Sequence, residues 1–283
     1  QELDIKFPVN EDVYTVKNYD KKIRDTSSEA QGAEFTKQVI DGTKEVKDDI
    51  IPTRGGLDIS IATKVLGNTE DILLSENSTG ISAGVLATIP GEETSLTASD
   101  SRISRKLDLD FFDIGITAGR KVDSLRGKSE IPKGKVPVII NQDALSMLLW
   151  FGLIPAINGE NIRKAKSVYQ GRKGDKVASE DLMIKDDPTK NWGIGSSAFD
   201  DEGVASREVS IIDSGVLMNF IYDLKEGLKS NKESTGNGIR GSFKSPPDIS
   251  DRNMMVRGEE SDRENLMAEK GILVDGVMGA HTL

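Results

Sequence analysis

Alternating apolar and polar residues between positions 57 and 89 constrain the fold of this chain more than any other feature. Residues 57–62 place apolar side chains at every second position, and residues 72–74 and 81–89 repeat this pattern. Because successive side chains of a strand point to opposite faces of a sheet, the pattern predicts strands with one buried face. The turn-prone segment 76–80 separates the second run from the third. We therefore expect an antiparallel meander.

Helical signals flank this sheet. Thr26 and Glu29 have the spacing of a capping box, in which Thr26 accepts from first-turn amides and Glu29 reaches back. Apolar residues at helical spacing then continue to about Lys47, and a second helix is expected over residues 108–125. Helices beside antiparallel strands predict an α+β fold with mixed or antiparallel sheets and flanking helices.

A change in composition divides the chain. Residues 131–135 combine proline and glycine with charged residues, and this segment is the expected boundary. The sequence thus predicts an N-terminal α/β region over residues 1–135 and a β-rich C-terminal domain over residues 136–283. The C-terminal domain opens with an expected short buried strand at 136–140, where Pro137 indicates an edge position.

A helix and a hairpin are expected further on. Asn141 or Asp143 can cap a helix whose apolar side chains share one face at helical spacing. The residues on that face are Leu145, Leu148, Leu149 and Gly152. Residues 204–212 and 216–222 are predicted to pair as a hairpin joined at 213–215, in a C-terminal part rich in β-hairpins.

Charge and composition exclude several classes of function. Acidic residues outnumber basic ones by 47 to 37, and the net charge of −10 opposes binding to a phosphate backbone. The absence of cysteine excludes disulfides and thiolate metal sites, and a single histidine, His281, excludes a His-pair metal site or a Ser-His-Asp triad within this chain. No apolar run approaches the roughly 20 residues that cross a bilayer. We expect a cytoplasmic protein with neither nucleic acid nor membrane as a partner.

Two polar segments are the candidate site. The carboxylates of Asp200, Asp201 and Glu202 have the chemistry of a Mg²⁺ or Ca²⁺ site. The favoured interpretation is a loop whose carboxylates accept hydrogen bonds from nearby amides and position the following hairpin. The second segment allows positive φ or close backbone approach at its glycines. It is either a structural turn or a contact for a peptide or partner, at Thr235, Gly236, Asn237 and Gly238.

Several segments together resemble the TldD/PmbA family. They are residues 197–204, 213–217, 234–238, 253–258 and 279–282, in this order. Residues 27–135 resemble the middle region of the family more loosely, and include the expected turn at 77–80. By this resemblance, the first strands and helices of the family precede Gln1, and a further strand of the family follows Leu283.

The resemblance implies a division into two branches. TldD-like members resemble a zinc protease with His-Glu-x-x-x-His on a helix, where two imidazoles hold the metal and the glutamate acts on its water. In this chain Trp150, Phe151 and Pro155 occupy the positions of that motif. None of the three can hold zinc or carry a proton, so the chain resembles the PmbA/TldE-like branch. Trp150 and Phe151 are expected to pack in the core, where they would also plug a vestigial site.

The expected function follows from this branch. The resemblance implies a non-catalytic subunit, without a metal or cofactor of its own, of a protease whose TldD-like partner supplies the zinc. The implied substrates are peptides or small unfolded proteins. One alternative is a stand-alone homodimer that binds peptides or proteins without protease activity. Another is a metallopeptidase with unusual ligands near Asp200, Asp201, Glu202 or His281, although a structural role is favoured for His281.

Overall fold

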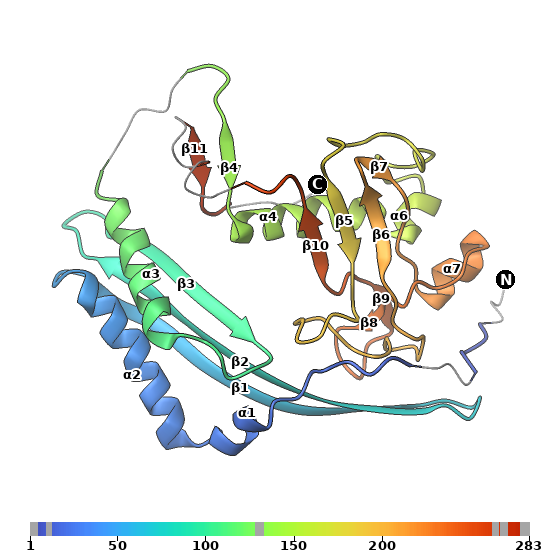
Figure 1. Ribbon diagram of the computed structural model, residues 1–283, viewed down its shortest axis with the longest axis horizontal. Coiled ribbons are helices and arrows are strands. Elements are labelled where there is room, and N and C mark those ends of the chain that lie inside the picture. The colour runs from blue at the N-terminus through green and yellow to red at the C-terminus, as the bar shows by residue number, and fades with distance from the viewer. Residues whose placement is uncertain (1–4, 10–12, 128–132, 262–265, 267–270, 278–283) are drawn as a thin grey trace.

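The chain folds into two parts that differ in architecture. The computed structural model describes residues 5–9, 13–127, 133–261, 266 and 271–277. Figure 1 shows a long twisted sheet with two helices along one face, and a smaller β-rich part above the far end of its two longest strands. The α+β prediction is confirmed. Among the described residues, no helix has both the length and the apolarity to span a bilayer.

The N-terminal part is built around a three-stranded antiparallel sheet in the order β1-β2-β3. Its elements are α1 (Lys21–Thr26), α2 (Glu29–Val46), β1 (Ile51–Gly67), β2 (Leu73–Ile89), β3 (Leu96–Ser104) and α3 (Phe111–Ser124). An antiparallel meander is present, as predicted, but the second and third predicted strands both lie in β2, and the actual third strand, β3, was not predicted. The second helix is confirmed. α3 begins after Asp110, whose side chain accepts from the Asp113 amide.

The turn predicted at residues 76–80 is wrong. These residues lie inside β2 and pair with β1 throughout, for example Asn77 with Thr63. The chain reverses instead at residues 68–72, where Asn68 Oδ1 accepts from the amides of Glu70 and Ile72. A complete ladder of hydrogen bonds to β1 outweighs the local turn preference of the polar residues.

The predicted cap of α2 is also displaced. Thr26 is the last residue of α1, and its hydroxyl donates to the Lys22 carbonyl. Ser28 caps α2 by accepting from the Gln31 amide at 3.3 Å. The unexpected short helix α1 therefore moves the start of α2 to Glu29.

The core of the N-terminal part lies between β2 and the two long helices. Alternate residues of β2, namely Ile81, Ala83, Val85, Ala87 and Ile89, are buried against them. The rings of Phe35 and Phe111 stack at 4.3 Å between centroids. α2 and α3 approach so closely that a Cβ on Gly115 would lie 2.1 Å from the Val39 carbonyl oxygen. Glycine is therefore required at this helix contact.

The C-terminal part begins with a short exposed strand and a broken helix. These elements are β4 (Val138–Ile140), α4 (Gln142–Leu148), the π-helical turn η1 (Leu149–Leu153), α5 (Ile154–Ile157) and α6 (Gly159–Arg163). Within the described part of the chain, β4 pairs only with β11 (Ile272–Val274), in parallel. Val138 is 53% exposed, so the prediction of a buried strand is wrong. Asn141 caps α4 by accepting from the Ala144 amide, as predicted.

The π-helical turn changes which residues share a face. A π turn inserts one extra residue per turn and rotates the side chains that follow it. Leu148 is 41% exposed and Trp150 is 55% exposed. The predicted single apolar face and the core position of Trp150 are therefore wrong, whereas Phe151 is half-buried.

The remaining strands enclose the second core. They are β5 (Met183–Asp186), β6 (Val209–Asp213), β7 (Val216–Leu217), β8 (Gly238–Arg240), β9 (Pro247–Ile249) and β10 (Met254–Arg257), with α7 (Leu224–Ser230) between β7 and β8. One sheet has the order β10-β5-β6-β7, and β8 and β9 form a separate hairpin. The β6–β7 hairpin turns at Ser214 and Gly215, with φ of 49° and 76°, as the sequence predicted. Its strands are shorter than expected.

Candidate functional site

The structure brings the two predicted polar segments together. Asp200 is fully buried, and its Oδ1 accepts from the amides of Glu202 and Val204, both at 2.9 Å. Its Oδ2 accepts from the Gly238 amide at 3.0 Å, while the Asp201 amide donates back to the Gly238 carbonyl at 2.9 Å. Burial raises the pKa of Asp200, and these amide donors oppose the shift. Carboxylates that accept from loop amides are the arrangement favoured from the sequence.

Asn237 extends this network to a residue that the sequence did not single out. Its Nδ2 donates to Asp186 Oδ2 and to the Ser250 carbonyl, both at 2.8 Å. Its Oδ1 accepts from Thr235 Oγ1 at 2.6 Å. Asp186 ends β5 and is fully buried. An isolated aspartate in a stretch with no recognised strand pattern offers no signal of such a position.

Asp186 also holds the segment before β10. Its Oδ1 accepts from the amides of Arg252 and Asn253 at 3.0 and 2.7 Å. Asn253 in turn donates from Nδ2 to the Asp187 carbonyl and accepts on Oδ1 from the Gly195 amide. Burial raises the pKa of neighbouring Asp251 to about 6, and the charge of Asp186 adds to this shift. These contacts complete a network of hydrogen bonds that joins four segments of the chain.

Glu202 lies at the edge of the network, on a cleft of about 610 Å³. Its Oε2 accepts from the Leu224 amide at 2.8 Å, and a Cβ on Gly238 would fall 2.4 Å from that oxygen. Any side chain at position 238 would clash with the Glu202 carboxylate, and this close approach explains why the residue is glycine. Burial raises the pKa of Glu202 to about 7, and the carboxylates of Asp200 and Asp223 push it in the same direction.

The other wall of this cleft comes from the N-terminal part. Lys64 of β1 forms an ion pair with Asp201 at 2.6 Å, and its Nζ lies 4.7 Å from the centre of the Phe199 ring. Two exposed aromatic side chains, Phe7 and Phe243, also line the cleft. The cleft thus combines an apolar rim with acidic and basic groups, a composition suited to a peptide.

Residues 77–80 lie where β2 passes beneath the C-terminal part. The Thr79 amide donates to the Asn18 carbonyl at 2.9 Å, and Asn18 Nδ2 donates to the Ser196 carbonyl at 2.8 Å. Glu76 Oε2 accepts from the Ala198 amide at 3.0 Å. These hydrogen bonds tie the long sheet to the loop that precedes Asp200.

The predicted motif helix lies elsewhere in the molecule. Figure 1 places α4 close to β4 and β11, away from β8 and β9. Trp150 is exposed, while Phe151 and Pro155 are half-buried. His281 lies outside the described residues. Among the residues that the structure does describe, no group of three or more acidic, histidine or cysteine side chains could hold a metal ion.

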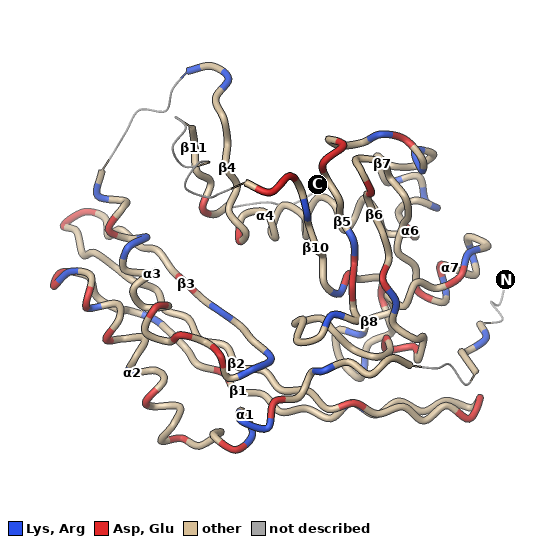
Figure 2. Tube along the Cα trace, in the orientation of Figure 1, with Lys and Arg blue, Asp and Glu red and all other residues tan. Residues whose placement is uncertain are grey.

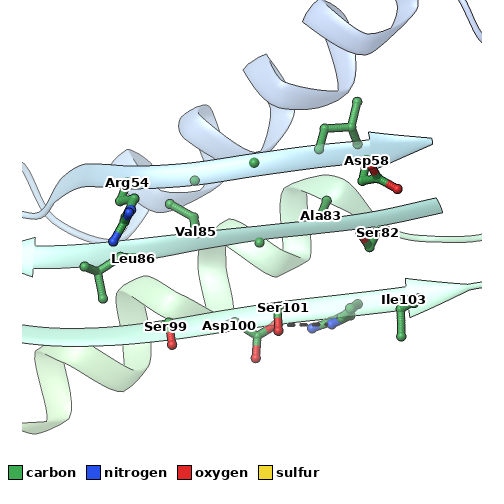
Figure 3. A pocket seen from close by; sticks show the side chains of 15 residues that line it. Arg54, Asp58, Ser82, Ala83, Val85, Leu86, Ser99, Asp100, Ser101 and Ile103 are labelled. Atoms are coloured by element: carbon green, nitrogen blue, oxygen red, sulfur yellow. Dashed lines mark ion pairs between the residues drawn. The ribbon is translucent and has the colours of Figure 1, made fainter. Parts of the chain in front are cut away.

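A separate groove of about 540 Å³ crosses the face of the long sheet opposite the helices (Figure 3). Its centre is the row Gly56–Gly84–Ser101, where two of three neighbouring strands lack a side chain. Arg54 borders one side of this row and Asp58 borders the other. None of the residues predicted for the site lines this groove.

Comparison with known proteins agrees with this architecture. The PmbA/TldA metallopeptidase C-terminal domain matches residues 133–283. An uncharacterised protein of Methanocaldococcus jannaschii is 28% identical over 265 residues, which cover 88% of this chain and 61% of that protein. A metalloprotease PmbA homologue of Buchnera aphidicola is 26% identical over 222 residues, which cover 76% of this chain and 47% of that protein.

A solved structure shares the fold over nearly the whole chain. TldE from Thermococcus kodakarensis superposes with a TM-score of 0.90 at 23% identity, covering 98% of this chain and 63% of TldE. The chain thus spans about three fifths or less of the length of these relatives. Because the family's C-terminal domain matches more than half of the residues, the chain belongs to the PmbA/TldD family.

Proposed function

We propose that this chain acts as a PmbA/TldE-like, non-catalytic subunit of a TldD/TldE-type metalloprotease that cleaves peptides or small unfolded proteins. The observation that carries the proposal is that Trp150, Phe151 and Pro155 stand where the resemblance to the family places the zinc motif. Indole, phenyl and pyrrolidine side chains do not ligate zinc, which takes imidazole, thiolate or carboxylate. The residues present do not fit a zinc site there, so the metal and the glutamate base belong to a TldD-like partner.

The surface around this helix supports a partner. Apolar side chains are exposed on α4, on the π-helical turn η1 and on the neighbouring β4–β11 pair, namely Val138, Ile140, Met147, Leu148, Trp150 and Leu273. A surface with several exposed large apolar residues indicates a protein contact. Tryptophan contributes strongly to such contacts because it buries a large rigid surface.

The cleft beside Glu202 supports peptide handling. Its walls come from both parts of the chain and offer aromatic side chains together with Asp201, Glu202 and Arg240. A subunit with this cleft would position an extended peptide while the partner cleaves it. The cytoplasm remains the expected location.

The first test measures zinc content and peptide cleavage of the full-length protein, alone and mixed with its TldD-like partner. We expect stoichiometric zinc and chelator-sensitive cleavage only in the mixture. Zinc and cleavage in the full-length protein alone would overturn the proposal and would support a metallopeptidase with unusual ligands.

A variant sharpens this test. Trp150→Glu is expected to weaken binding to the partner at least about tenfold, because a charge replaces an exposed aromatic contact. Val168→Glu is the matched control, since Val168 is 75% exposed and follows α6, outside α4, η1 and the β4–β11 pair. Equal affinities of the two variants would exclude Trp150 and the π-helical turn η1 from the contact.

The homodimer is the alternative that remains. It predicts a mass of two chains without the partner, binding of peptides, and no cleavage in any mixture. Light scattering of the full-length protein alone and with the partner distinguishes the two proposals.

A further inference from the structure

A second cleft, of about 540 Å³, has an unusual concentration of positive charge. It opens between α6, the end of α7 and the segment after β7, residues 219–222. Four cationic side chains line it, namely Arg163, Lys173, Arg207 and Lys232. Figure 2 shows basic positions on both α6 and α7 at this side of the molecule. Such a cluster stands out in a chain with a net charge of −10.

Half of this charge is not neutralised by carboxylates of the described residues. Arg163 pairs with Glu226 at 2.8 Å, and Glu233 is the one acidic residue of the lining. Four cations therefore face two carboxylates, which leaves an excess of two positive charges. Lys173 donates only to the neutral Asn219 Oδ1, at 3.0 Å. The Lys232 amide donates to the Gly227 carbonyl at 2.8 Å, but the ammonium group of its side chain has no hydrogen bond or ion pair to any described residue.

The floor of the cleft is aromatic. Phe220 and Tyr222 are each 8% exposed and line the cavity. The Tyr222 hydroxyl forms no hydrogen bond with any described residue, and burial raises the pKa of Tyr222. The phenol therefore stays protonated at neutral pH and is available as a donor. Cations at the rim above an apolar floor match a ligand with a negative end and an apolar body.

Thr235 connects this cleft to the candidate site. Its side chain lines the cavity, accepts from the Tyr222 amide at 2.8 Å and donates to Asn237 Oδ1. The Asn237–Asp186 network therefore fixes the wall of the basic cleft as well as the backbone next to Glu202. The two clefts lie on either side of one rigid polar network.

We propose that the basic cleft binds the C-terminal carboxylate of a peptide, with the apolar side chain of the last residue against Phe220 and Tyr222. This inference rests on the proposed function, because it names the end of the peptide that the subunit holds. A singly charged carboxylate can be held by Lys173 and Lys232 together. Nucleic acid does not fit, since the acidic chain as a whole repels a polyanion.

Binding of short peptides to the full-length protein tests this assignment without the partner. The probes are an N-terminally labelled pentapeptide ending in leucine, the same peptide with a C-terminal amide, and inorganic phosphate. Fluorescence anisotropy should show at least about tenfold weaker binding of the amide, the effect of losing one charge-assisted hydrogen bond. Lys232→Gln should weaken the carboxylate peptide by about threefold to tenfold and leave the amide unchanged.

The matched control is Lys44→Gln, which removes one exposed positive charge from α2. It should not change binding of either peptide. Equal affinities for the two peptides, or no binding of either, would overturn the inference. Phosphate binding as tight as that of the carboxylate peptide would also overturn it, because the site would then accept any oxyanion. Cleavage that still requires the TldD-like partner would leave the proposed function standing in each of these cases.

Discussion

The two parts of this protein are stabilised by different kinds of interior. In the N-terminal part, alternate apolar residues of β2 pack against α2 and α3, and the buried polar residues among those described are few, namely Asn18, Thr43, Thr79 and Asp100. In the C-terminal part, an apolar core lies beside a network of fully buried polar groups that includes Asp186, Asp200 and Asn237. The stability of the N-terminal part depends on the apolar area that is removed from water. The stability of the C-terminal part depends also on a hydrogen-bond partner for each buried donor and acceptor.

This difference distinguishes the N-terminal part, which supports the fold, from the C-terminal part, which carries most of the candidate site. An apolar core tolerates conservative changes of shape, because its stabilisation is non-directional. A buried carboxylate that accepts several amides fixes the backbone of each donor in one geometry. The clefts to which we assign peptide binding lie next to the buried polar network of the C-terminal part.

The largest expected effect comes from breaking the polar network. Asp186→Ala removes the acceptor for Asn237 Nδ2 and for the amides of Arg252 and Asn253. Leaving these buried donors unpaired should cost about 4 kcal/mol of unfolding free energy, measured by urea denaturation. Asp213→Ala, at an exposed hairpin position, is the control and should cost below about 0.5 kcal/mol. Similar costs for both variants would contradict a stabilising role for the network.

A somewhat smaller effect is expected in the apolar core. Ile114 is 0% exposed in α3, and Ile114→Ala should cost about 3 kcal/mol through lost burial and a residual cavity. Ile61→Ala makes the same change at a residue that is 48% exposed, and should cost below about 1 kcal/mol. A small loss at Ile114 would show that this interior can collapse around a cavity.

The pH dependence distinguishes the two interiors further. The pKa of Glu202 is raised from 4.5 to about 7, so the folded state binds more protons than the unfolded state between these values. Its contribution to stability is complete below pH 4.5 and is lost as the pH rises through 7. Glu202→Gln keeps an acceptor for the Leu224 amide and should flatten this decline by about 1 kcal/mol, after allowance for solvent screening. The decline is measured from denaturation midpoints of both proteins between pH 4.5 and 8. Identical slopes of midpoint against pH in the wild type and in Glu202→Gln would count against the raised pKa of Glu202.

The smallest effect concerns the contact between the two parts. The Lys64–Asp201 ion pair joins β1 to the loop after Asp200, at partly exposed positions. A double-mutant cycle with Lys64→Met and Asp201→Asn should give a coupling of about 0.5 kcal/mol, which decreases as salt is added. A coupling that salt does not change would point to a hydrogen-bonding role instead.

The comparison also explains which features were predictable. The antiparallel pairing of β1 with β2, the helix α3 and the turn at 213–215 were predicted because each depends on local periodicity or turn chemistry, whereas β3 was not predicted. The turn at 76–80 was mispredicted because the pairing of β1 with β2 overrides local preference along the whole strand. Asp200 and Asn237 were singled out as candidates, but their connection through Asp186 has no local signature.

By itself, the sequence determined the alternating strands and the flanking helices, because these follow from residue type and spacing, whereas the placement of Trp150, Phe151 and Pro155 at the zinc-motif positions came from the resemblance to the family. Only the tertiary structure decided that Trp150 is exposed, that residues 77–80 lie inside a strand, and that Thr235 connects two clefts. Those outcomes depend on which segments, far apart in the chain, meet and exclude water. Hydrogen bonds such as that between Asn237 and Asp186, 51 positions apart, form only when the whole fold has closed.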